Sequence, residues 1–314
     1  MKQVGRVAAT TLPVLLTGES GTGKEVVAKA LHNRSERADG PFVALNCGAI
    51  PAELIESELF GHTKGCFTGA DRDRLGLWEE ATGGTIFLDE ITETTLSFQV
   101  KLLRAIQQGE IRRVGSNEMR QLDVRVIAAS NRDVEQEVSG GRFRHDLFYR
   151  LNAVSIKVPA LRDRQEDIPL LVETFAQRAS TKSRVRFAPE VFDILSRYSW
   201  PGNIRELEHA IVSAVAICDG TVLIEDLPGP IKGFCESVDN PSRVDSIAPV
   251  KDWPALAMVE GDYVSRALMH NNWNKQATAV MLKVDRKTLD RMIKRHKIMR
   301  SQSEPQPMTS RRAA

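Results

Sequence analysis

Five short apolar runs recur through the first half of the chain, separated by longer segments with helical periodicity. The runs are residues 13–17 (PVLLT), 42–46 (FVALN), 85–89 (TIFLD), 124–130 (VRVIAAS) and 153–159 (AVSIKVP). Strands this uniformly apolar suit a parallel sheet that is covered on both faces. Because helical segments alternate with the runs, the pattern predicts a βαβ architecture of the α/β class.

The pattern changes after about Glu166, where strand signals stop and helical periodicity continues. Residues 229–250 are rich in Gly, Pro, Ser and charge, which indicates a linker. Helical periodicity returns over residues 252–298, and a disordered tail is expected from Ser301. The predicted organisation is an α/β core (1–163), a helical subdomain (164–230), a linker (231–250), a second helical domain (251–300) and a tail (301–314).

Composition restricts the class of protein. With 314 residues, 42% of them hydrophobic and 27% charged, the chain fits a packed, soluble protein of more than one domain. We find neither an apolar run long enough to span a membrane nor a secretory signal at the N-terminus. The four cysteines, at 47, 66, 218 and 235, are too scattered for a metal site or a disulfide framework, and they favour a reducing, cytoplasmic location.

The net charge of +2 hides an asymmetry along the chain. Residues 251–314 carry thirteen Lys and Arg against six Asp and Glu, so the rest of the chain is acidic. A basic terminal domain on an acidic body favours nucleic acid as a partner. A solvated helix face would give a similar charge pattern, so this signal is weak when taken alone.

A glycine-rich segment, GESGTGKE, follows the first predicted strand and opens a helix. It fits G-x-x-x-x-G-K, in which backbone N–H groups surround a phosphate chain and the lysine reaches the outer phosphates. The predicted nucleotide-binding residues are Gly18, Glu19, Ser20, Gly21, Thr22, Gly23, Lys24 and Glu25. Glu25 stands where the general pattern has Ser or Thr, a magnesium ligand.

Charged residues elsewhere complete the chemistry of a nucleotide hydrolase. Asp89 and Glu90 end the third apolar run, where Asp89 would hold Mg²⁺ and Glu90 would polarise the attacking water. Arg144 and Arg150 precede the fifth run and are either surface ion pairs or arginine fingers reaching a neighbouring subunit. Arg205, in the helical subdomain, would sense the same nucleotide.

A second glycine-rich segment, GHTKGCFTGA at residues 61–70, contains one aromatic residue, Phe67. Glycines at this density indicate a loop. Taken alone, the segment leaves two interpretations of Phe67 open. Its ring either anchors the loop to the core or is exposed as a contact.

Residues 12 to about 228 closely resemble the central AAA+ ATPase domain of bacterial enhancer-binding proteins, which activate sigma-54 RNA polymerase. The matching segments are GESGTGKE (Glu25 included), LNCGAI, ESELFGH, GGTIFLDEI, KLLRAIQQGEIRRVG, FRHDLFYRL, LRDRQEDIPLL and WPGNIREL. The resemblance implies an AAA+ P-loop NTPase with a parallel sheet and an α-helical lid. It also implies ATP and Mg²⁺ as cofactors, a hexameric ring and a cytoplasmic protein.

The same resemblance assigns roles to residues of this chain. It implies that a sigma-54 contact loop is formed by Gly65, Cys66, Phe67, Thr68, Gly69 and Ala70, with Cys66 where the family has alanine. Asn46 would restrain Glu90, and Asn131 would act as a sensor. Arg144 and Arg150 would act on the neighbouring subunit's nucleotide, and Arg205 would be the sensor in the lid.

Residues 252–298 resemble the Fis-type helix-turn-helix that ends many of these proteins. WNKQATAVML would be the first helix of the pair and DRKTLDRMIKRHK the recognition helix. The implied DNA-binding residues are Arg286, Lys287, Thr288, Arg291, Lys294 and Arg295. A merely basic, solvated helix is the alternative. Lys283 lies in the turn where the family commonly has glycine.

Two departures from the family leave alternatives open. From the sequence we expect no receiver or sensory domain before the ATPase and no counterpart of the segment that helps to wrap the adenine. Because Lys24, Asp89, Glu90 and Phe67 are all intact, we expect an ATP-hydrolysing activator that works from upstream DNA on the sigma-54 polymerase closed complex. The alternative is a DNA-binding regulator with a truncated, inactive ATPase. An AAA+ chaperone is disfavoured by Phe67, Thr68 and the basic C-terminal domain.

Overall fold

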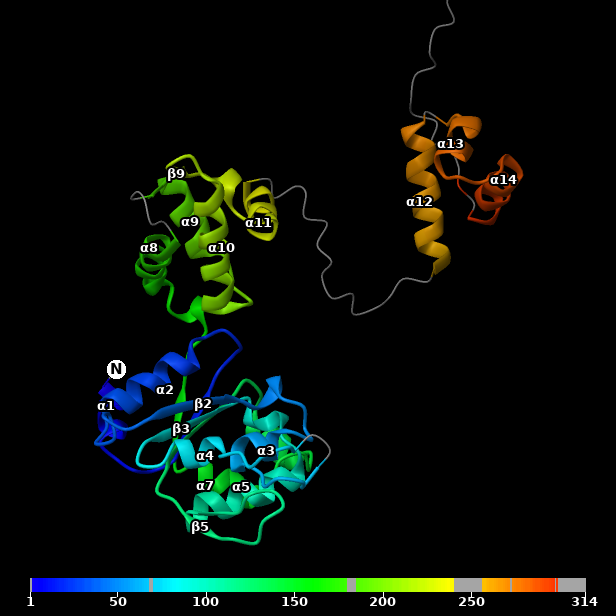
Figure 1. Ribbon diagram of the computed structural model, residues 1–314. Helices are drawn as coiled ribbons and strands as arrows, with labels where there is room; N and C mark the ends of the chain where they lie inside the picture. The colour runs from blue at the N-terminus through cyan, green and yellow to red at the C-terminus, as the bar shows by residue number, and fades with distance from the viewer. Residues whose placement is uncertain are drawn as a thin grey trace, which may run out of the picture. The chain divides into compact units, whose positions relative to one another are not determined.

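The computed structural model describes residues 2–67, 70–179, 185–239, 256–271, 273–296 and 298. The chain forms two compact units, Met1–Pro241 and Ser242–Ala314, which are described separately (Figure 1). Among the helices in these described ranges, none is both long and apolar enough to cross a membrane.

A five-stranded parallel sheet forms the centre of the first unit. Its strands are β1 (Val14–Thr17), β2 (Phe42–Asn46), β3 (Thr85–Asp89), β6 (Arg125–Ser130) and β7 (Val154–Lys157), in the order β2-β3-β6-β1-β7. Every neighbouring pair is parallel, and Asn46 lies beside Asp89 in the register. The predicted α/β class and all five predicted strands are confirmed.

Both faces of this sheet are buried, as the uniformly apolar runs require. Leu15, Ile86 and Leu88 point into one core, which α3 (Ile55–Phe60), α4 (Leu77–Glu80), α5 (Leu96–Gln108) and α7 (His145–Leu151) help to form. The alternate residues Leu16 and Phe87 point into the other, where α1 (Lys2–Ala8) and α2 (Lys24–Asn33) pack. The helix α6 (Val134–Ser139) follows β6, and β4 (Glu110–Ile111) pairs antiparallel with β5 (Arg120–Gln121).

Arg125 joins the first helix to the sheet. Its side chain is 2% exposed, and it donates hydrogen bonds to the carbonyl oxygens of Val7 and Ala8 at 2.9 and 3.0 Å. These carbonyls lie at the C-terminal end of α1, where a helix leaves carbonyl groups unpaired and favours a cation. The helix end thereby supplies acceptors for two nitrogens of a buried guanidinium, while its Nε has no hydrogen-bond partner in the described chain.

The helical subdomain has its own core, formed by α8 (Ile168–Ala179), α9 (Pro189–Arg197), α10 (Asn203–Ile217) and α11 (Gly229–Asp239). A short parallel pair, β8 (Arg186–Phe187) with β9 (Thr221–Val222), supplements the helices. The linker predicted from residue 231 is wrong for residues 231–239, because this stretch continues α11 and Ile231 is buried in the core. Burial of that apolar face outweighs the weak helix propensity of its glycines.

The second unit is a small three-helix arrangement of α12 (Leu256–His270), α13 (Lys275–Met281) and α14 (Arg286–Arg295). Its core contains Val264, Leu268, Ala279 and Leu289. In the turn between α13 and α14, Lys283 has a φ of 54°, the left-handed region that favours glycine. The predicted helices of this region are confirmed, whereas the predicted tail at residues 301–314 and most of the linker lie outside the described residues.

Candidate functional site

The phosphate loop connects the carboxyl end of β1 to the start of α2. Gly18, Gly21 and Gly23 all have φ between +20° and +160°, and Gly23 is the N-cap of α2 without a side-chain hydrogen bond. The first N–H groups of α2 therefore have no side-chain acceptor at their cap residue, which leaves them free to donate to an anion. Glu25 is exposed and pairs with Lys29 at 2.7 Å, so its carboxylate does not crowd the loop.

Lys24 is almost completely buried within this loop, at 7% exposure. Its Nζ donates to the carbonyl oxygens of Gly18 at 2.8 Å and Glu19 at 3.0 Å. Burial lowers the pKa of Lys24, and this is partly offset by the negative charges of Asp89 and Glu90. The lysine and the two carboxylates thus lie within electrostatic reach of one another at one edge of the sheet.

Glu90 follows β3 in a strained conformation. Its φ of 53° and ψ of 43° are left-handed, which costs a residue with a Cβ about 1–3 kcal/mol. Its carboxylate packs on Gly48, where a Cβ would lie 2.3 Å from Oε2. The side chain of Asn46 accepts hydrogen bonds from the amides of Gly48 and Ala49, so it adjoins Glu90 through Gly48 rather than by a direct hydrogen bond.

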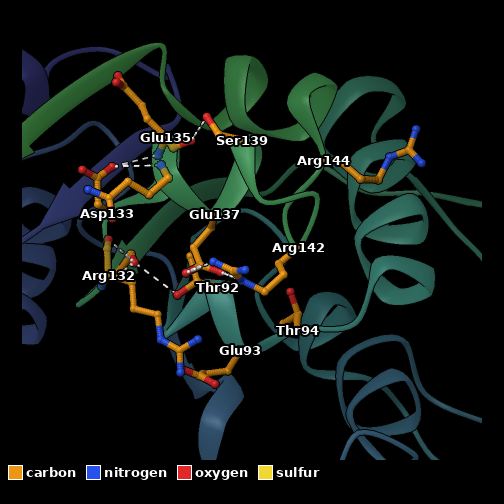
Figure 2. A network of polar contacts seen from close by, with 12 residues as sticks. Thr92, Glu93, Thr94, Arg132, Asp133, Glu135, Glu137, Ser139, Arg142 and Arg144 are labelled. Carbon is orange, nitrogen blue, oxygen red and sulfur yellow. Dashed lines mark hydrogen bonds and ion pairs between the residues drawn. The ribbon is translucent and has the colours of Figure 1, made fainter.

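The residues after β6 link this carboxylate loop to α6 (Figure 2). Ser130 Oγ lies 3.2 Å from Thr92 Oγ1, and Arg132 forms an ion pair with Glu93 at 2.7 Å. Asn131, the predicted sensor, is exposed between them. It lines a cavity of about 520 Å³ together with Thr17, Gly18, Lys157 and Arg162.

The two predicted arginine fingers lie near α7. Arg144 pairs with Asp146 at 2.7 Å, and Figure 2 shows its guanidinium directed away from the Arg132–Glu93 pair. Arg150 is exposed, with one long hydrogen bond of 3.5 Å to the carbonyl oxygen of Ile106. Both side chains therefore extend from the surface of the subunit rather than into its own phosphate loop.

A buried glutamine that the sequence did not single out positions Arg144. Gln99 is fully buried, and its Nε2 donates to the carbonyl oxygens of Thr94 and Arg142, at 3.0 and 3.1 Å. Its Oε1 accepts from the amide of Arg144 at 2.9 Å. One side chain thus connects the segment after Glu90 to the backbone that carries the arginine.

The helical subdomain, which is the predicted lid, and the segment that leads into it supply further residues that the sequence did not single out. Arg205, which was predicted, donates to Ser20 Oγ at 3.3 Å. Arg162, Arg164 and Asn203 also contact the phosphate loop. Arg162 holds Glu19 with two hydrogen bonds, and together with Asn203 it lowers the pKa of Glu19 to about 2. The only signal in the sequence was that these residues lie in segments resembling the family.

The predicted contact loop is held at its base, and its aromatic residue is partly exposed. His62 bridges to Arg74 and to Val114, and the amide of Gly65 donates to the carbonyl oxygen of Ala70 at 2.8 Å. Phe67 is 38% exposed, lies outside the core clusters of the described residues and contacts the His62 ring edge-on, with centroids 5.0 Å apart. Ala70 is 5% exposed, so its side chain is not offered to a partner, while Thr68 and Gly69 lie outside the described residues.

In the second unit, α14 presents a basic face. The exposed basic residues are Arg286, Lys287, Arg291, Lys294 and Arg295. Thr288 is half-buried; its amide and its hydroxyl donate to the two carboxylate oxygens of Asp285 at 3.0 and 2.6 Å, so Asp285 caps the helix. Arg295 lies 3.8 Å from Glu260, and Asp290 is neutralised by Lys275 at 2.8 Å.

Comparison with known proteins agrees with this arrangement of parts. The Sigma-54 interaction domain family matches residues 1–157, the AAA+ ATPase lid domain family 162–241, and the bacterial regulatory protein Fis family 255–296. The transcriptional regulatory protein ZraR of Klebsiella oxytoca is 49% identical over 293 residues, which cover 92% of this chain and 65% of that protein. The regulatory protein AtoC of Escherichia coli K12 is 44% identical over 295 residues, covering 92% and 63%.

A solved structure supports the same relationship. NtrX from Brucella abortus in complex with ATP matches with a TM-score of 0.70 and 32% sequence identity, over 95% of this chain and 66% of that one. The chain thus spans slightly less than two thirds of the length of these relatives. Its matched regions follow the order sigma-54 interaction domain, lid and Fis-type region. The chain therefore belongs to the Sigma-54 interaction domain family of bacterial transcriptional regulators.

Proposed function

We propose that this chain is an ATP-hydrolysing transcriptional activator that binds upstream DNA and remodels the sigma-54 RNA polymerase closed complex. The observation that carries the proposal is the convergence of Lys24 with Asp89 and Glu90 at one edge of the sheet. A phosphate-binding lysine and a carboxylate pair at the same edge of a parallel sheet supply the charged groups that hydrolysis of a phosphate anhydride uses.

The phosphate loop is suited to a nucleotide. Lys24 Nζ binds two loop carbonyl oxygens, a position from which it can exchange to phosphate oxygens. Asp89 accepts the amide of Glu90 at one carboxylate oxygen, and within the described chain its other oxygen accepts no hydrogen bond. Asp89 would hold Mg²⁺ together with the phosphates, and the ion would neutralise phosphate charge. Glu90 would polarise the attacking water.

The arginines complete the proposed ring. Arg144 and Arg150 extend outward, so each would reach the nucleotide of a neighbouring subunit, in a hexamer by our proposal. Arg205 already contacts Ser20 of the phosphate loop from the lid. Asn131 and Asn46 border the same region and would report the state of the nucleotide.

Two surfaces would connect hydrolysis to transcription. The loop from Gly65 to Ala70, with Phe67 exposed, would contact sigma-54. The basic face of α14 would contact DNA, where exposed Arg and Lys side chains meet phosphates and base edges.

The proposal predicts separate losses for binding and hydrolysis. Glu90→Gln removes the water-polarising carboxylate, so ATPase turnover should fall at least about 100-fold while nucleotide affinity changes little. Lys24→Ala should instead weaken nucleotide binding itself. Turnover by the Glu90→Gln variant at the wild-type rate would contradict the role of Glu90. An unmodified chain that binds no nucleotide would contradict the proposal as a whole.

Shared sites are tested by mixing two inactive variants. Arg144→Ala subunits lack the arginine but keep the phosphate loop, and Lys24→Ala subunits have the opposite defect. If Arg144 acts across a subunit boundary, some sites in mixed rings have both groups, and part of the ATPase activity should return. Mixed rings that stay inactive at every ratio would contradict a shared site.

DNA binding is tested with the full chain and duplex DNA. Affinity should fall steeply as salt rises, because phosphate contacts release counterions. Lys294→Ala should weaken binding to all sequences, whereas Arg291→Ala should also relax sequence preference. Binding that ignores salt would contradict a phosphate-contacting face.

A further inference from the structure

Four consecutive residues of the phosphate loop are hydrogen-bonded by the lid and by the segment that leads to it. Arg162 binds the carboxylate of Glu19, and the amide of Ile204 donates to the carbonyl oxygen of Gly21 at 2.9 Å. Arg164 donates to the carbonyl oxygen of Thr22 at 2.7 Å. Ser20, the remaining residue, is held through its carbonyl oxygen by Asn203.

Asn203 is the residue that joins these contacts. It is fully buried, and its Oδ1 accepts the amide of Leu161 at 2.8 Å. Its Nδ2 donates to Glu19 Oε2 at 3.1 Å and to the carbonyl oxygen of Ser20 at 3.0 Å. One side-chain amide thus ties the chain that enters the lid to two adjacent residues of the phosphate loop.

The backbone at Asn203 is held in an unusual conformation. Its φ of 53° lies in the left-handed region, and Trp200, three residues earlier, has a φ of 50°. This region is uncommon for residues with a Cβ, although asparagine tolerates it better than most, and such residues gather at functional sites. The conformation aims the Asn203 amide at the loop.

We propose that Asn203 is a positioning residue that shapes the phosphate loop for the di- or triphosphate of a nucleotide. This inference rests on the proposed nucleotide binding. Asn203 holds the side chain of Glu19 and the backbone of Ser20 together, so displacement of the lid is transmitted directly to the loop. Asn203 acts through the loop, with no contact to phosphate of its own.

Three variants of Asn203 separate its side chain from its backbone. Asn203→Gly keeps the left-handed backbone accessible and removes only the side-chain hydrogen bonds. Asn203→Asp keeps the acceptor for Leu161 but places a carboxylate against Glu19. The double variant Asn203→Asp with Glu19→Gln restores a donor–acceptor pair in the reverse direction.

Val222→Ala is the matched control for damage to the lid. Val222 is fully buried in the core of the helical subdomain and makes no hydrogen bond to the phosphate loop. Its truncation should destabilise the lid and leave the hydrogen bonds of Asn203 to Glu19 and Ser20 unchanged. A role confined to lid stability would give the same result in this control as in the Asn203 variants.

The test titrates each full-length variant with fluorescent ADP and with ATP under conditions without hydrolysis. Asn203→Gly should weaken binding about tenfold, the factor that corresponds to one buried hydrogen bond. Asn203→Asp should weaken it further, and the added Glu19→Gln should recover part of the loss. Val222→Ala should lower the melting temperature and leave affinity within about twofold.

The outcomes distinguish the two proposals. Failure of the unmodified chain to bind ADP overturns the proposed function and this inference together. Normal binding by the unmodified chain, with equal affinity in Asn203→Gly, overturns the inference alone. An equal loss of affinity in Val222→Ala also overturns it, because lid stability would then explain the effect.

Discussion

The chain contains two glycine-rich loops that use glycine for different physical reasons. In the phosphate loop, a Cβ on Gly21 would lie 2.3 Å from the carbonyl oxygen of Gly202, and one on Gly18 would lie 2.5 Å from that of Val158. In the contact loop, a Cβ on Gly65 would meet nothing within 4 Å. Both Gly21 and Gly65 have positive φ. The first loop therefore needs glycine for close approach, and the second needs it for backbone conformation.

The hydrogen bonds around the two loops differ in the same way: the phosphate loop is closely surrounded, and the contact loop is more open. Residues 19–22 are bound by side chains and backbone from the lid and the segment that leads to it. The contact loop is held at its base by bonds to Val114, Asp73 and Arg74, whereas the Phe67 ring is 38% exposed. A loop with few buried contacts opens at little cost in free energy. The many bonds to the phosphate loop suit the binding of a defined ligand, and the exposed Phe67 suits the partner contact that we propose.

The largest expected effect compares alanine at Gly21 with alanine at Gly65. Gly21→Ala combines left-handed strain with a clash against backbone, so the free energy of unfolding should fall by about 3 kcal/mol or more. Gly65→Ala adds only the strain, about 1 kcal/mol. Chemical denaturation of both variants measures the difference. Equal losses would contradict the division between the two loops.

The next effect concerns pH. Arg162, and then Asn203, hold the pKa of Glu19 at about 2, below its value in the unfolded chain. A lowered pKa means that this contribution to stability is complete above about pH 4.5 and is lost as the pH falls toward 2. The difference in unfolding free energy between the unmodified chain and Glu19→Gln should stay constant from pH 8 to pH 5 and then shrink. Shrinkage that is complete by pH 6 would contradict the pairing.

A smaller effect on stability is expected at Phe67. Because the ring is 38% exposed and packs on His62 outside the core, Phe67→Ala should lower the free energy of unfolding by less than about 1.5 kcal/mol. Capture of sigma-54 with a transition-state analogue of ATP should nevertheless be lost. Phe98→Ala is the matched control, since Phe98 is fully buried and its truncation should cost about 3–5 kcal/mol. Equal thermal shifts in the two variants would make Phe67 a core anchor.

The smallest effect is a difference in alkylation rate between two thiols, measured on the folded protein. Cys47 is buried, and burial raises its pKa to about 12, so its reactive thiolate is scarce at pH 8. Cys66 is half-buried in the contact loop. Brief alkylation of the native protein at pH 8, followed by mass spectrometry of peptides, should modify Cys66 well before Cys47. Modification of Cys47 at the same rate as Cys66 would mean that the hydrophobic core next to Asp89 and Glu90 opens readily to solvent.

Much of the architecture followed from the sequence because its signals are local. The five apolar runs gave the strands to within one or two residues, since only strands buried on both faces are so uniformly apolar. The predicted start of the linker at residue 231 was wrong because the deciding contact there is tertiary and not local. Gly, Pro and Ser near α11 suggested a linker, but burial of Ile231 in the lid core stabilises the helix.

The sequence by itself determined the order of the parts, the phosphate loop and the carboxylate pair after β3, because each depends on residues adjacent in the chain. The tertiary structure alone decided that Glu19 is held by Arg162 and Asn203, which lie 143 and 184 residues away. It also decided that Gln99 joins Thr94 to Arg144. Such pairings depend on where the packed sheet and lid place distant backbone segments, and no periodicity or local motif records that geometry.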